Sequence, residues 1–253
     1  MAFFVWFSIL IVTLYGLGQL AGPWLDQPRY RILFLPGYLL GMVARLIGCQ
    51  LTYAEIKEIR LLSGDRRVVH HRPPRIPTAG PVILAGLPVM ILVSAYFALD
   101  VHEGPVFADS ALELPTDIPF RLSAIEVLAD AAIDRTQLLW DLFNGAGFDP
   151  SDQALFLFLA TSLLLAAAPL QGEIKPLLLI MLGLIVAARA AEWLGLSFAY
   201  LSNGWFLQSF YGTEAWQRFS FLVVYTLFLL LLAGLLRLVV YAYIRLRPRP
   251  SEG

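Results

Sequence analysis

The stretch QRFSFLVVYTLFLLLLAGLLRLVVYAYI, residues 217–244, decides the fold class. Its only charged side chains are Arg218 and Arg237. A helix of about 20 apolar residues crosses a hydrocarbon core of about 30 Å. Because backbone polar groups in lipid must be paired within their own segment, a run of this kind becomes a helix. The stretch therefore predicts a transmembrane helix.

Five further apolar runs have similar character, at about 2–23, 32–51, 79–99, 153–169 and 176–198. The composition agrees, because 58% of the 253 residues are hydrophobic and 15% are charged, against about 45–50% and 25% in soluble domains. The first run has no basic segment before it and is interpreted as a retained span rather than a cleaved signal. The sequence predicts an all-α polytopic membrane protein with about six transmembrane helices in a single membrane domain, 1–253.

Two regions outside these runs have their own patterns. Residues 53–72 alternate loosely around Ser63-Gly64-Asp65, which predicts a small β-hairpin. Residues 100–152 form an acidic loop, within which about 119–143 is predicted to be an amphipathic surface helix. An acidic helix is poorly suited to anionic lipid, so we expect it to pack on protein.

Loop charge suggests an orientation. Arginines and a lysine are concentrated in 55–75 and in the tail after the last run. Basic loops stay in the cytoplasm. With six spans, this rule places both termini in the cytoplasm and the acidic loop outside. The expected location is a bacterial cytoplasmic membrane.

The stretch FLPGYLLGMVARLIG, residues 34–48, resembles the zinc-site helix of the site-2 protease family of intramembrane metalloproteases. In that family a Pro-Gly pair and apolar residues precede His-Glu-x-x-His, whose histidines share a helix face and bind one zinc. Gly41, Met42 and Arg45 stand at the positions of the first histidine, the glutamate and the second histidine. None of them is a zinc ligand of that kind, and a guanidinium repels the metal. The resemblance implies a degenerate member, a pseudoenzyme without proteolytic activity, catalytic residues or metal.

The resemblance extends weakly over 32–190. The hairpin region and 80–93 are similar to the family's next elements, and APLQGEIK, residues 168–175, is similar to a motif in which Glu173 would replace a metal-facing aspartate. The alternative is an ordinary packing helix. Small residues four apart let helices approach closely, and the chain has two such pairs, Gly18 with Gly22 and Gly37 with Gly41.

Other metal or cofactor chemistry has little material. The chain has one cysteine, Cys49, and three histidines, His70, His71 and His102. His70 and His71 are adjacent, so on an extended segment they point to opposite faces and cannot share an ion. We therefore expect neither a replacement metal site nor a cofactor.

Three ionisable residues, Arg45, Arg189 and Glu192, fall inside apolar runs, where a charge costs about 2.5–3.5 kcal/mol and needs a partner or water. Arg189 and Glu192 are three apart and can pair on one helix or line a polar cavity. If the family register holds, Arg45 pairs with Glu173, with Glu55 as the competing partner. An aromatic cluster is expected to form an interfacial belt or, alternatively, a lipid or quinone pocket: Trp193, Phe198, Tyr200, Trp205, Phe206, Phe210, Tyr211 and Trp216.

The sequence favours a non-catalytic protein that binds or stabilises another membrane protein, as an interaction or structural subunit of a complex. Its partners would be membrane lipid and that protein, with no nucleic acid. The alternative is a small transporter or carrier that uses Arg45, Arg189 and Glu192 in a polar path; a third hypothesis is an enzyme with a lipid-soluble substrate. A water-filled pocket that contains all three residues would favour the carrier, and a dry bundle with an apolar outer surface would favour the interaction protein.

Overall fold

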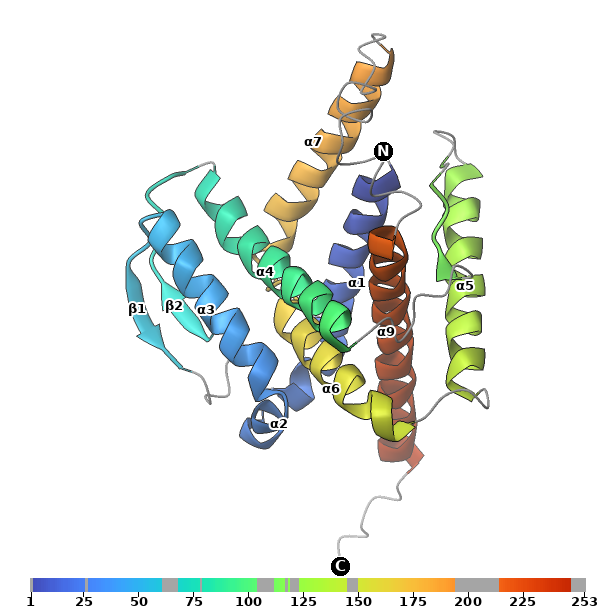
Figure 1. The fold of residues 1–253 in the computed structure, drawn as a ribbon. Coiled ribbons are helices and arrows are strands. Elements are labelled where there is room, and N and C mark those ends of the chain that lie inside the picture. The colour runs from blue at the N-terminus through green and yellow to red at the C-terminus, as the bar shows by residue number, and fades with distance from the viewer. Residues whose placement is uncertain are drawn as a thin grey trace, which may run out of the picture.

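A computed structural model describes residues 2–25, 27–60, 68–77, 79–103, 112–116, 118, 123–144, 150–193 and 214–246. These residues form eight helices and one two-stranded sheet (Figure 1). The helices are α1 (Ala2–Leu25), α2 (Pro28–Leu33), α3 (Leu35–Leu51), α4 (Ala79–Glu103), α5 (Ser123–Asn144), α6 (Pro150–Ala167), α7 (Ile174–Trp193) and α9 (Glu214–Leu246).

Three of the helices are long and apolar enough to cross a membrane. They are α1, the Ala79–Leu99 part of α4 and the Glu214–Tyr243 part of α9. The apolar helices α3 and α6 are shorter than a typical span. The structure thus supports a helical membrane protein, whereas the expected number of six spans is not confirmed.

The first and last helices pack together and run in the same direction. The Phe3 ring lies 5.2 Å from that of Phe219 between centroids, and further along both helices Leu20 lies beside Gly234. If both helices cross the membrane, the start of α1 and the end of α9 therefore lie on opposite sides (Figure 1). The expected location of both termini in the cytoplasm, which requires an even number of crossings, stays a prediction.

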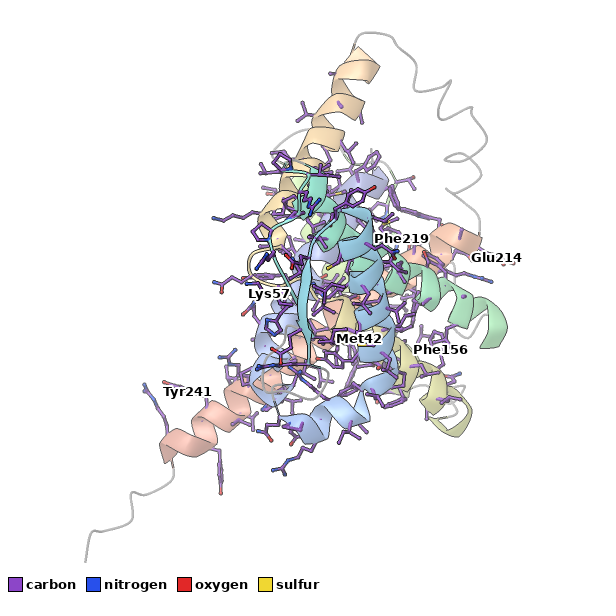
Figure 2. All side chains as sticks on the ribbon, turned by 90° about the vertical axis from the view of Figure 1, so that its left-hand side faces the viewer. Met42, Lys57, Phe156, Glu214, Phe219 and Tyr241 are labelled. Atoms are coloured by element: carbon purple, nitrogen blue, oxygen red, sulfur yellow. The ribbon has the colours of Figure 1, made fainter. Side chains whose placement is uncertain are left out.

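Helices α6 and α7 do not form an antiparallel pair. Residues 168–173 join them, and α7 packs on α1 and α4 instead of folding back along α6. Both views show α7 continuing away from the end of α6 (Figures 1 and 2). Pro169 lacks the N–H that a continuous helix needs at this point. The sequence predicts two separate spans here. In the structure the corresponding helices, α6 and α7, follow one another without a reversal of the chain.

The hairpin is present beside α3. Strand β1 (Ile56–Ile59) pairs antiparallel with β2 (Val69–His71), with Ile56 opposite His71 and Ile59 opposite Val69. The predicted Ser63-Gly64-Asp65 turn lies outside the described residues. Val68, which precedes β2, is buried against the helices, so the hairpin covers part of the bundle.

The predicted amphipathic helix is α5, and it packs on protein as expected. Leu139 is fully buried, and the Phe143 ring meets that of Phe228 on α9 edge-to-face at 5.4 Å. The preceding segment is held on α9 as well: the Leu114 N–H donates to Ser220 Oγ and Trp216 Nε1 donates to the Leu114 carbonyl. Residues 119–122, the start of the predicted helix, lie outside the described part.

Apolar side chains are exposed on the outer faces of several helices. Leu179, Leu182 and Val186 of α7 are each more than half exposed, as are Leu235 and Leu238 of α9. The part of α9 around Tyr241 extends beyond the rest of the bundle (Figure 2). Such apolar surfaces are stable in contact with lipid, because lipid tails are as apolar as the leucine side chains that face them. The distribution agrees with a membrane protein.

Candidate functional site

The candidate site lies at the interruption between α6 and α7. The Glu173 N–H donates to the Leu170 carbonyl at 2.8 Å, and the Leu170 N–H donates to Glu173 Oε2 at 2.9 Å. The turn therefore pairs the N–H groups of Leu170 and Glu173 and the Leu170 carbonyl at the break. It also fixes the position of the Glu173 carboxylate at the start of α7.

Arg45 of α3 meets this carboxylate. Its Nη1 donates to Glu173 Oε1, and its Nη2 donates to Glu173 Oε2 at 3.2 Å. The geometry is the two-pronged pairing that strengthens arginine–carboxylate contacts. The two side chains are 14% and 16% exposed. The predicted pair is thus present, and it joins α3 to a residue 128 positions further along the chain.

The competing partner, Glu55, is occupied elsewhere. Its Oε2 accepts from Arg72 Nη1 at 2.6 Å, and the two side chains are 64% and 61% exposed. This pair closes the base of the hairpin together with the backbone bond from the Arg72 N–H to the Glu55 carbonyl. Among the described residues, the Arg45–Glu173 pair thus lies inside the bundle, whereas the Arg72–Glu55 pair lies at its surface.

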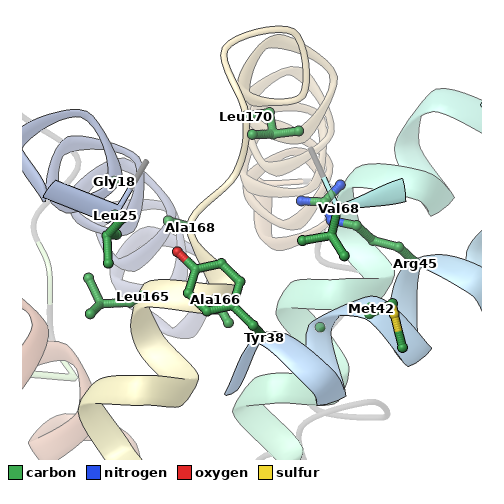
Figure 3. Close-up of a pocket in the computed structure, with 11 residues that line it drawn as sticks. Gly18, Leu25, Tyr38, Met42, Arg45, Val68, Leu165, Ala166, Ala168 and Leu170 are labelled. Atoms are coloured by element: carbon green, nitrogen blue, oxygen red, sulfur yellow. The ribbon is translucent and has the colours of Figure 1, made fainter. Parts of the chain in front are cut away.

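A small cavity of about 30 Å³ has Arg45 among its lining residues (Figure 3). Gly41, Met42 and Arg45, the three positions of the degenerate motif, all line it, together with Gly18 and Ala168. One water needs about 10–15 Å³ of such space. The cavity therefore has room for about two waters and is too small for a metabolite or a peptide.

Close backbone contacts surround the cavity. A Cβ at Gly37 would lie 2.0 Å from the Ser162 carbonyl oxygen, and a Cβ at Gly18 would lie 2.8 Å from the Ala168 Cβ. Gly41 faces Ala166, four residues after Ser162. The glycine pair of α3 therefore packs on small residues of α6, and Gly18 packs on the break itself. Gly22, its predicted partner, is buried.

Ser162 links α3 and α6, and sequence reasoning missed it. Its hydroxyl donates to the Phe34 carbonyl at 2.9 Å and accepts from the Gly37 N–H at 2.9 Å. Arg31 was also missed; it is 1% exposed and its Nε donates to the Leu25 carbonyl at 2.9 Å. A serine in an apolar helix and an arginine between two apolar runs were the available signals.

The other predicted residues do not join the site. Arg189 is exposed on α7 and does not line the cavity; the Glu192 side chain, which the sequence pairs with it, lies outside the described residues. Of the aromatic cluster, Trp216 is described; it lies in the first turn of α9 and is buried in the hydrophobic core. For the remaining members no side chain is described.

His70, His71 and Cys49 do not line the cavity. His70 and His71 lie in β2, where both are half-buried, and Cys49 is buried near the end of α3. The His102 side chain is outside the described part. Among the residues that the structure describes, no three His, Cys, Asp or Glu side chains are grouped as metal ligands would be.

The arrangement has a limited chemical capacity. Arg45 and the Leu170 N–H together use three acceptor positions of the Glu173 carboxylate, which has about four. These donors fix the Glu173 carboxylate between α3 and the start of α7. The site is therefore built to join helices.

Comparison with protein-family models, with curated proteins and with solved structures finds no match.

Proposed function

We propose that this chain is a non-catalytic integral membrane protein on a degenerate site-2-protease-like scaffold, which acts by binding another membrane protein. The observation that carries the proposal is the ion pair between Arg45 and Glu173. In the register of the resemblance, both residues stand where that family would hold its metal. Here they neutralise each other beside a cavity with room for about two waters.

The carrier alternative has less support. A polar path would bring Arg45, Arg189 and Glu192 to one water-filled space. Arg189 is exposed near the far end of α7, away from the cavity that Arg45 lines. The Arg45 guanidinium is already paired with the Glu173 carboxylate, so it is poorly placed to bind a transported anion.

Helix α7 is the surface that we propose for the partner. One side packs on α1 and α4, with Leu177 4% exposed. The opposite side carries exposed aliphatic residues, among them Leu179 and Leu182, at 68% and 57%. A transmembrane helix of a partner can cover such a face by side-chain packing.

Photo-crosslinking in the native membrane tests this proposal. A crosslinking amino acid at Leu182, which faces outward, should give a discrete adduct with a second protein that mass spectrometry can identify. The same amino acid at Leu177 is the matched control, because it faces α1 and α4 and should react only within the chain. If Leu182 gives no protein adduct, or gives only adducts with a second copy of this chain, the proposed heteromeric role is wrong.

A further inference from the structure

A second, larger groove lies on the other side of the molecule, between α5 and α9. Its volume is about 400 Å³, within the range of about 300–1,000 Å³ found for small-molecule sites. The α5 wall consists of Thr136, Gln137, Trp140 and Asp141, and the α9 wall of Phe228, Leu231, Leu232 and Leu235. Neither the candidate site nor the proposed function uses this groove.

The α9 wall is aliphatic and open. Leu231 and Leu235 are each 62% exposed, and Leu232 is 41% exposed. All three lie inside Glu214–Tyr243, a candidate membrane span. A surface of this kind at this position accommodates a hydrocarbon chain, which loses nothing by leaving bulk lipid.

The α5 wall is polar and acidic. Asp141 is the ionisable residue among the lining side chains, and beside it Trp140 is 55% exposed. Arg135, the cation of α5, is directed elsewhere, because its Nε donates to the Glu113 carbonyl at 3.1 Å. A carboxylate next to an indole attracts an ammonium group through charge and through the ring face.

The two walls together define an amphiphile. Its apolar part fits the leucines of α9 and its cationic end fits Asp141 and Trp140, whereas an anionic headgroup would be repelled by the aspartate. We propose that this groove binds one phospholipid whose headgroup ends in an ammonium, as in phosphatidylethanolamine. The Gln137 amide supplies a donor for the phosphate of the same headgroup.

Native mass spectrometry of the full chain in mild detergent tests the site. Titration with phosphatidylethanolamine should give one tightly retained lipid, and titration with phosphatidylglycerol should give weaker binding. Loss of one exposed charge or ring contact corresponds to about a fivefold weaker affinity, which is the change we expect for Asp141→Asn and for Trp140→Leu. Asp141 is exposed, so Asp141→Asn leaves the packing of α5 on α9 intact, whereas Trp140→Leu also removes a ring contact with Phe228 at 6.2 Å.

Asp134→Asn is the matched control, because Asp134 is an exposed aspartate of the same helix that does not line the groove. It should leave the affinity unchanged. Leu232→Trp, which fills the groove from α9, should abolish retention. Equal binding of phosphatidylglycerol, equal losses in Asp134→Asn and Asp141→Asn, or no retained lipid at all would each overturn the proposal.

Discussion

The ion pair at the break offers a quantitative test of the site. Arg45→Met removes the cation but keeps a long side chain, and Glu173→Gln removes the anion but keeps an oxygen for the Leu170 N–H. Each single change leaves a charged group inside the bundle without its partner, which costs about 3–5 kcal/mol for a fully buried pair. Because the side chains are 14% and 16% exposed, we expect about 2–4 kcal/mol for each change. The double variant removes both charges, so its cost should fall short of the sum by about 2 kcal/mol.

The free energy of unfolding can be measured by titrating the protein from mild detergent into sodium dodecyl sulfate and following tryptophan fluorescence. The matched control is the exposed pair of Arg72 and Glu55, changed to Gln singly and together. Each exposed change should cost no more than about 1 kcal/mol, with almost no coupling. If the changes at Arg45 and Glu173 are additive, or couple no more strongly than the control pair, the reasoning is refuted.

Three further outcomes are expected. Gly37→Ala should destabilise the protein by at least about 2 kcal/mol, because its Cβ would lie 2.0 Å from the Ser162 carbonyl oxygen; Gly183→Ala, which meets nothing within 4 Å, should not. Elemental analysis of the purified protein should find no stoichiometric zinc, and one zinc per chain would contradict the pseudoenzyme hypothesis. Since α1 and α9 run parallel, an impermeant thiol reagent applied to intact cells should reach only one of Phe4→Cys, near the start of α1, and Tyr243→Cys, near the end of α9, each introduced in a Cys49→Ser background; labelling of both or of neither would contradict two parallel membrane crossings.

The positions of the helices along the chain could be predicted from the sequence, whereas the direction of each helix relative to its neighbours could not. The runs predicted from apolar length and charge are 2–23, 32–51 and 217–244. Their ends lie within a few residues of the ends of α1, α3 and α9. The direction of a helix relative to its neighbours depends instead on tertiary packing. Pro169 and Gly172 indicate a break in the helix, but a break is compatible both with a reversal of the chain and with its continuation in the same direction. The number of crossings and the side of each terminus therefore could not be derived from these runs.

The site was predictable where a charge needed a partner. An arginine inside an apolar run needs an ion-pair partner, and the apolar runs contain few acidic residues. The pairing of Arg45 with Glu173 could therefore be predicted from the register of the resemblance. Ser162 gave no such signal, because a hydroxyl in an apolar helix can bond to its own helix backbone. Its bonds to Phe34 and Gly37 depend on how closely α3 and α6 approach.

Glu173 has two roles: it accepts a hydrogen bond from the Leu170 N–H at the break, and it pairs with the Arg45 guanidinium. The two roles can be separated by mutation. In the Arg45→Met variant no buried cation needs an ion-pair partner, but the Leu170 N–H still needs an acceptor inside the bundle. In that background Glu173→Gln should cost little, since the amide oxygen accepts the same bond. Glu173→Leu removes the acceptor and should cost about 1–3 kcal/mol more than Glu173→Gln, the penalty of an unsatisfied buried donor. Equal stability of the two double variants would show that water in the adjoining cavity replaces the carboxylate, and that Glu173 acts on the turn only through its charge.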